Sequence, residues 1–312
     1  MKSRCSLVLS CAIALSLAAP ALAQWVPLLP GWTAHEVPLN ASLACTPYDW
    51  GLAVDPFSGD LFVAGVIPNV STWSSILRVD TLGQVSTAAS PAGTLRPELD
   101  PVHRMLYQRA QEEILVYNEG GATLPPIGAG LIGPIAAGHD GELYSLQWHF
   151  PGQTTLDLVR YESSTDIWVP VMRTSTFPFP WWTEMPTRLL LDAEGTVYFF
   201  TDDITAFRID GTLIVALGTG PQLGPANVGP GFLFLGEWFI DPGAAGVQAW
   251  TRFAAPTTSG QVCVGSGVRP DGSVVFLSAN PPAGDVCSLV VFTRDETPTV
   301  HRSWGALKSA AH

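Results

Sequence analysis

Positively charged residues are scarce in this chain, and their scarcity limits the partners that it can bind. The 312 residues include 15 lysines and arginines against 27 aspartates and glutamates, a formal net charge of −12. Removal of Lys2 and Arg4 with an expected leader leaves 13 cations against 27 acids, or −14. Because so acidic a surface repels phosphate backbones, we expect no nucleic-acid partner.

Long apolar runs are equally scarce, since only the start of the chain holds one. Lys2 and Arg4 precede an apolar run at residues 7–17, and Ala21-Leu22-Ala23 supplies the small residues of a cleavage site. The run is shorter than the ~20 residues that a spanning helix needs, and no later window approaches that length. Residues 1–23 are therefore predicted to be a signal peptide, and the chain carries no predicted membrane span.

The predicted mature chain begins at Gln24 and is secreted or periplasmic. A lipoprotein anchored through Cys11 is the weaker alternative, because it leaves an unusually short apolar region. Three cysteines remain after cleavage, and export favours a disulfide among them. We favour a bridge between Cys263 and Cys287, with a bridge from Cys45 to either as the alternative and one thiol left over.

Several catalytic signatures are missing. The sequence has no Gly-x-Ser-x-Gly elbow, no His-Glu-x-x-His pair, no Cys-x-x-Cys and no phosphate-cradling glycine loop. The six histidines show no ligand-like spacing. His139 is interpreted as a turn residue before Asp140-Gly141, and His149 alone is placed where it can reach a ligand. Stretches with 3.6-residue periodicity are scarce too, so we expect almost no helix after residue 23.

What the chain does contain is a weak internal repeat. Six times a turn-forming cluster runs into a short apolar strand, at intervals of 45, 37, 54, 36 and 41 residues. These intervals match one four-stranded propeller blade. The six copies are Gly59-Asp60-Leu61-Phe62-Val63, Arg104-Met105-Leu106-Tyr107, Gly141-Glu142-Leu143-Tyr144, Gly195-Thr196-Val197-Tyr198-Phe199, Gly231-Phe232-Leu233-Phe234 and Gly272-Ser273-Val274-Val275-Phe276.

A second pattern follows about fifteen residues after several copies. Arginine and an acid alternate with apolar residues in Leu77-Arg78-Val79-Asp80, Val159-Arg160-Tyr161-Glu162 and Phe207-Arg208-Ile209-Asp210. Period-2 alternation is typical of a half-buried strand. Short apolar runs before the turns, such as Gly51-Leu52-Ala53-Val54, suit innermost strands. The predicted fold is therefore all-β, a six-bladed β-propeller of four-stranded antiparallel blades.

These residues resemble the NHL-repeat and SMP-30/gluconolactonase-like β-propellers as a pattern across residues 48–305. Blades one and four are most similar, and blades two and five are degenerate. The predicted organisation is a segment at residues 24–47 that leads into the propeller, the propeller itself at 48–305, and a tail at 306–312. The lactonases of the group use a Glu, an Asn and an Asp around one divalent ion, but no positions here match that set. The motifs thus specify fold rather than function.

Function is expected at the face formed by loops that enter the inner strands and loops that join strands two and three. A long, proline-stiffened loop at residues 174–182 adds aromatic residues there, and Phe150 and the Glu112-Glu113 pair lie on the same face in this interpretation. Two structural explanations remain as alternatives. In the first, Asp202-Asp203 accepts hydrogen bonds from backbone amides of its loop. In the second, the long loop folds back and fills the channel. The candidate ligand-binding residues are Tyr48, Asp49, Trp50, Trp148, His149, Trp181, Trp182, Asp202, Asp203, Glu237, Trp238 and Asn280.

Three functions fit this face. The first is an exported, monomeric propeller that binds a small molecule, glycan or protein without catalysis. The second is a metal-dependent hydrolase, lactonase or lyase, with a calcium-like ion on Asp49, Asp202, Glu237 and Asn280, because hard cations prefer such oxygen ligands. The third is a structural scaffold. Asp55, Asp192 and Asp271 are assigned to hairpin turns, where aspartate accepts local backbone hydrogen bonds.

Overall fold

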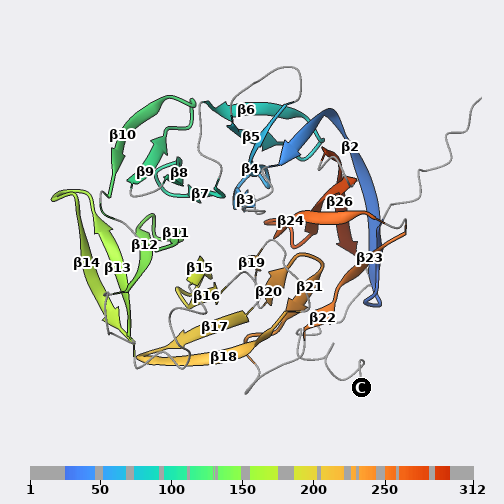
Figure 1. Cartoon of the computed structure of the whole chain (residues 1–312). Helices are drawn as coiled ribbons and strands as arrows, with labels where there is room; N and C mark the ends of the chain where they lie inside the picture. The colour runs from blue at the N-terminus through green and yellow to red at the C-terminus, as the bar shows by residue number, and fades with distance from the viewer. Residues whose placement is uncertain are drawn as a thin grey trace, which may run out of the picture.

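The computed structural model is a ring of six β-blades around a central channel (Figure 1). It describes residues 25–45, 52–67, 74–90, 95–110, 113–128, 130, 133–148, 155–174, 186–201, 205–220, 226–229, 232–243, 250–257, 260–280 and 285–295. Every regular element in these ranges is a β-strand. The described part of the chain therefore contains no helix that could cross a membrane.

Each blade has four antiparallel strands, so the fold prediction is confirmed. Blades two to five are separate sheets, whereas blades one and six form one eight-stranded sheet through the pairing of β2 with β4. The innermost strands are β3 (Leu52–Val54), β7 (Pro97–Asp100), β11 (Ile135–Ala137), β15 (Pro186–Leu191), β19 (Ala226–Gly229) and β24 (Val262–Val268). The second strands are β4 (Leu61–Val66), β8 (Met105–Ala110), β12 (Leu143–Trp148), β16 (Val197–Thr201), β20 (Phe232–Leu235) and β25 (Val274–Asn280). All six second strands coincide with the six copies of the sequence repeat.

The outer half of the blades is less regular. The third strands are β5 (Ser75–Val79), β9 (Glu113–Tyr117), β13 (Leu156–Glu162), β17 (Thr205–Asp210), β21 (Trp238–Ile240) and β26 (Asp285–Arg294). The fourth strands are β6 (Val85–Ala89), β10 (Thr123–Ile127), β14 (Ile167–Arg173), β18 (Leu213–Thr219), the two-residue β22 (Thr251–Arg252) and β2 (Trp32–Cys45). Two short strands, β1 (Trp25–Pro27) and β23 (Ala254–Pro256), pair beside blades five and six.

The arginines of the third strands contact acids of the second. The Nε atom of Arg78 donates to Asp60 at 2.7 Å, and Arg160 lies 3.9 Å from Glu142. Asp60 and Glu142 each follow a turn glycine in the repeat, so in blades one and three the arginine of the alternating pattern forms an ion pair across the hairpin. In blade four this acid is replaced by Thr196, and Arg208 instead pairs with Asp210 and donates to the Pro242 carbonyl of blade five.

The core lies between the blades. Six hydrophobic clusters occupy the six interfaces between neighbouring blades. In blade four, Leu189 and Leu191 face blade three while Leu190 faces blade five. Because both faces of a blade are buried, second strands such as β4, β16 and β20 are continuous apolar runs, whereas exposed residues interrupt the third strands β5 and β13.

The ring closes through β2. β2 pairs with β26 from Trp32 opposite Arg294 to Ala44 opposite Asp285, and its end pairs with β4 of blade one. In Figure 1 the blue β2 lies beside the red β26. Most of the segment that we expected merely to lead into the propeller is thus the outer strand of blade six.

The favoured disulfide is not formed. Cys263 is a free, buried thiol whose Sγ donates to the Gly265 carbonyl at 3.2 Å. Burial raises the pKa of this thiol well above its usual value. Cys287 belongs to β26, and β25 lies between that strand and β24. The side chains of Cys45 and Cys287 lie outside the described part of the chain, so a bridge between them stays a prediction.

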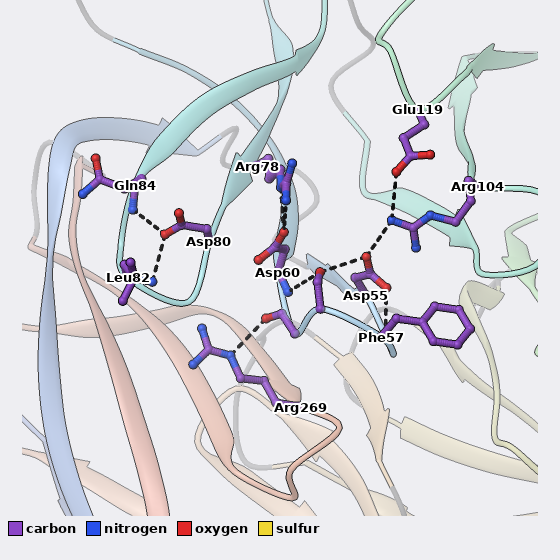
Figure 2. A network of polar contacts seen from close by, with 12 residues as sticks. Asp55, Phe57, Asp60, Arg78, Asp80, Leu82, Gln84, Arg104, Glu119 and Arg269 are labelled. Carbon is purple, nitrogen blue, oxygen red and sulfur yellow. Dashed lines mark hydrogen bonds and ion pairs between the residues drawn. The ribbon is translucent and has the colours of Figure 1, made fainter.

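Hydrogen bonds and ion pairs from polar side chains connect the hairpin turns of neighbouring blades to each other. Figure 2 shows Arg104 of blade two donating to Asp55 of blade one, at 2.8 Å, and the Nε of Arg269 in blade six donating to the Gly59 carbonyl, at 3.0 Å. Burial by itself raises the pKa of Asp55, but hydrogen bonds from Arg104 and from nearby groups of its own turn outweigh burial and lower it.

Arg104 makes its contact from a strained backbone. Its φ of 57° lies in the left-handed region, where the equivalent turn residues of blades one, three, four and six are all glycine. A left-handed non-glycine residue costs of order 1–3 kcal/mol unless its surroundings enforce it. The ion pair with the buried Asp55 compensates for this strain.

We therefore expect Arg104→Ala to lower the free energy of unfolding by about 2 kcal/mol, because it loses the ion pair and keeps the strain. Arg104→Gly should be less destabilising by roughly 1 kcal/mol, because glycine adopts this φ freely. Urea unfolding of both variants measures the difference.

The same ion pair makes stability depend on pH. Since Asp55 has a lowered pKa, its contribution to stability is present at neutral pH and is lost as pH falls through that pKa, so both variants should show a shallower loss of stability in acid. An Arg104→Gly variant less stable than Arg104→Ala would contradict this account.

Candidate functional site

Most of the residues predicted to bind a ligand lie outside the described part of the chain. This holds for Tyr48, Asp49, Trp50, His149, Trp181, Trp182, Asp202 and Asp203, and also for Glu112 and Phe150, which were expected on the same face. Glu113, the neighbour of Glu112, is the exposed first residue of β9. Trp148 and Asn280 are the last residues of β12 and β25, but their side chains are also outside it. The predicted loop-face site therefore stays a prediction.

Two of the predicted site residues have described side chains, and these lie together near Arg252. Glu237 is buried, and its Oε1 lies 3.4 Å from Nη2 of Arg252. The guanidinium of Arg252 also lies over the half-buried ring of Trp238, 5.7 Å from its centroid. Neither Glu237 nor Trp238 lines the central cavity. The burial and pairing of Glu237 indicate a structural role in blade five.

The central channel encloses a cavity of about 290 Å³. Its walls come from the inner strands of all six blades and from the hairpin turns that follow five of them. The volume is near the lower end of the range for small-molecule sites. The apolar wall residues are Ala53, Val54, Leu99, Ala136, Ala137, Leu190, Leu191, Val228 and Val268.

A charged bridge crosses the channel. Nη1 of Arg96, at the start of blade two, donates to the Ala226 carbonyl of blade five at 2.7 Å, and its Nε lies 3.0 Å from Glu98. The side chains of Arg96 and Glu98 are only 10% and 11% exposed. Because both charges are nearly buried, each depends on its partner, and the pair forms a fixed polar part of the cavity wall.

Asn227 supplies a second polar point in the wall. Its Nδ2 donates to the Leu52 carbonyl at 3.1 Å and to the Ser266 carbonyl at 2.7 Å, while its Oδ1 accepts from the Val228 amide. One side chain of blade five thereby joins blades one and six at the channel.

The hairpin turns form the end of the cavity at the face opposite the predicted loop-face site. The turns of blades three, four and six are closed by a hydrogen bond from a glycine amide to the carbonyl three residues earlier, and each glycine has a φ near 80°. The second residue of these turns lines the cavity, as do Pro56 and Pro101 at the same place in blades one and two. In blades three, four and six this residue is His139, Ala193 and Pro270.

Sequence reasoning assigned His139 to a turn and did not single out Glu194, the third residue of the turn in blade four. Both side chains are exposed and both line the cavity. The signal that would have found His139 is its place in the repeat, because proline is favoured at the second turn position and histidine is not. The sequence gives no comparable signal for Glu194, the third residue of its turn. Among the described residues no group of three or more His, Cys, Asp or Glu side chains is arranged to hold a metal ion.

Comparison with known proteins supports the fold. No protein-family model and no curated protein matches the sequence. A solved structure of a proposed gluconolactonase has a TM-score of 0.53 and 12% identity, over 87% of this chain and 98% of that one. A proposed oxidoreductase (glucose dehydrogenase) from Thermus thermophilus has a TM-score of 0.52 and 15% identity, over 84% and 100%.

A third structure is an auxiliary nutrient-binding protein from Bacteroides thetaiotaomicron, with a TM-score of 0.52 and 12% identity, over 83% of this chain and 73% of that one. The architecture thus matches gluconolactonase-like six-bladed propellers, as the sequence pattern predicted. At these identities the likeness concerns the fold alone.

Proposed function

We propose that this protein is an exported six-bladed propeller that binds a small organic ligand in its central channel. The cavity of about 290 Å³ carries the proposal, because it combines apolar walls with a few convergent polar groups. Export rests on the leader-like residues 1–23. The predicted loop-face residues, Asp49 and Trp181 among them, would then surround the other end of the same channel.

The names of the fold neighbours favour a ring-shaped, hydroxylated ligand as the first class to test. They include a proposed gluconolactonase, a proposed glucose dehydrogenase and a nutrient-binding protein. A monosaccharide-sized molecule suits the volume of the cavity. A panel of monosaccharides, sugar acids, amino sugars and lactones is therefore the starting screen.

Blocking the cavity tests the proposal. Ala193 is exposed and lines the cavity from a turn, so Ala193→Trp should obstruct it without disturbing the core. We expect at least a tenfold weaker affinity, measured by calorimetry, for any ligand that raises the melting temperature of the unmodified protein. Ala122→Trp, in an exposed turn outside the cavity, is the matched control and should bind normally. Equal affinity in both variants would place the ligand elsewhere and refute the proposal.

The rival function is a metal-dependent hydrolase that uses Asp49, Asp202, Glu237 and Asn280. The burial of Glu237 and its ion pair with Arg252 argue against this set of metal ligands. Calcium binding only to the native state would raise the melting temperature by mass action. We expect the melting temperature to be the same in calcium and in chelator. A clear rise in calcium that is lost in Asp49→Asn would favour the rival.

A further inference from the structure

We propose that the channel ligand is a small organic cation, such as a primary amine on a ring, held at the hairpin-turn end of the cavity by Glu194 and His139. This inference rests on the proposed function and adds the entry face and the charge of the ligand. It places recognition opposite the loop face that the sequence indicated.

The first step is that the turns themselves do not require these two side chains. The three four-residue turns close through the same backbone bond, from Gly141, Gly195 and Gly272. Blade six has Pro270 at the second turn position, and prolines also lie at the cavity in blades one and two. Blade three has His139 instead. A residue that lines a cavity and that the turn does not need is available for a ligand.

The second step is that both groups are free to bind. No hydrogen bond or ion pair joins the side chain of His139 or Glu194 to another residue in the structure as described. In contrast, the carboxylate of the adjacent Asp192 accepts from the Thr196 amide at 2.7 Å and from the Tyr198 hydroxyl at 3.0 Å. Glu194 therefore offers a carboxylate, and His139 a ring nitrogen, from neighbouring blades of the same cavity.

The third step is the charge of the cavity. Its two arginines are engaged elsewhere. Arg96 pairs with Glu98 and donates to the Ala226 carbonyl. Arg269 donates to the Gly59 carbonyl between blades one and six (Figure 2), and its charge interacts with Asp271, Asp60 and Asp80. Neither Asp192 nor Glu194 forms an ion pair within the described ranges. The cavity lining thus holds three acids, Glu98, Asp192 and Glu194, against two arginines, a formal excess of one negative charge. The chain as a whole has a formal net charge of −12. A cation is attracted there and an anion is repelled.

The fourth step is the shape of the opening. Pro56, Pro101 and Pro270 line it from blades one, two and six, whereas His139 and Glu194 line it from blades three and four. The three prolines give one side apolar contact surface, and the other side carries the carboxylate and the imidazole. A ring that bears an ammonium group matches both sides, because the ammonium donates to the carboxylate while the ring contacts the prolines.

Two matched sets of probes test the inference by calorimetry. One set is benzylamine, benzyl alcohol and benzoate, and the other is glucosamine, glucose and glucuronate. In at least one set we expect the amine to bind at least tenfold more tightly than the neutral probe, and the acid most weakly. Glu194→Gln should weaken amine binding at least tenfold, and His139→Pro should weaken it several-fold. Glu162→Gln, which changes an exposed acid outside the cavity, should leave it unchanged.

The outcomes separate this inference from the proposed function. If no amine binds more tightly than its neutral partner, or if Glu194→Gln binds amines normally, the inference is overturned. The proposed function still stands in that case when Ala193→Trp abolishes binding of a neutral probe. Amine binding that survives Ala193→Trp contradicts both. Weaker amine binding at high salt, with neutral binding unchanged, supports a charge-based site.

Discussion

Replacing Trp25 by alanine is expected to lower the free energy of unfolding by about 3–5 kcal/mol. The ring is only 1% exposed and lies in the cluster between blades five and six. It packs edge-on against Phe276 with 5.5 Å between ring centroids, and its Nε1 donates to the Ser278 hydroxyl at 2.9 Å. Truncation leaves a cavity in a dense aromatic core and leaves Ser278 without this donor.

Two variants separate these causes in urea unfolding. Trp25→Phe keeps much of the packing and loses the hydrogen bond, so it should cost less than the alanine change. Val26→Ala changes the next residue, which is 47% exposed, and should cost under about 0.5 kcal/mol. If Trp25→Ala were as mild as Val26→Ala, the amino-terminal strand would not be part of the cooperative fold.

The repeat could be predicted because each blade requires the same residue types at the same places in its first turn and its second strand. A tight turn needs a left-handed residue, which explains Gly59, and the following strand needs apolar residues, which explains Leu61. The pairing of Arg78 with Asp60 is also local, within one hairpin. Signals of this kind lie within some twenty residues, so they can be recognised without knowledge of the tertiary structure.

The ring closure could not be predicted, because its partners are far apart in sequence. Nothing in residues 32–45 specifies that they pair with a strand about 250 residues later. The same limit applies to Trp25, whose position after an expected leader suggested a connecting segment. The cysteine prediction was wrong at Cys263 for a related reason: membership of one blade does not make two strands adjacent, and β25 separates β24 from β26.

The candidate site shows a different limit. Sequence reasoning favoured the loop face because its loops are long and aromatic, and it set the opposite face aside because short turns need no function. The cavity, however, follows from the small side chains of the inner strands, such as Ala53 and Ala136, whose convergence only the ring reveals. His139 became informative only when its turn was compared with the turns of the other blades.

Asn227→Ala is expected to cost roughly 3 kcal/mol, the second large effect. Asn227 is 7% exposed and donates to the carbonyls of Leu52 and Ser266, so one side chain links blade five to blades one and six. Alanine removes both donors and the acceptor for the Val228 amide. A buried polar group left without its partner costs about 1–3 kcal/mol, and several are affected here.

Asn40→Ala is the matched control for this change, measured by the same urea unfolding. Asn40 also donates to a side chain, Gln84, at 3.0 Å and accepts from a backbone amide, Val85, at 2.7 Å, but it is exposed. Water can replace its bonds, so its loss should cost under about 1 kcal/mol. Equal losses in the two variants would mean that water inside the channel satisfies the carbonyls of Leu52 and Ser266. The inner strands of blades five, six and one would then be held by their apolar contacts alone, without the amide that joins them at the cavity wall.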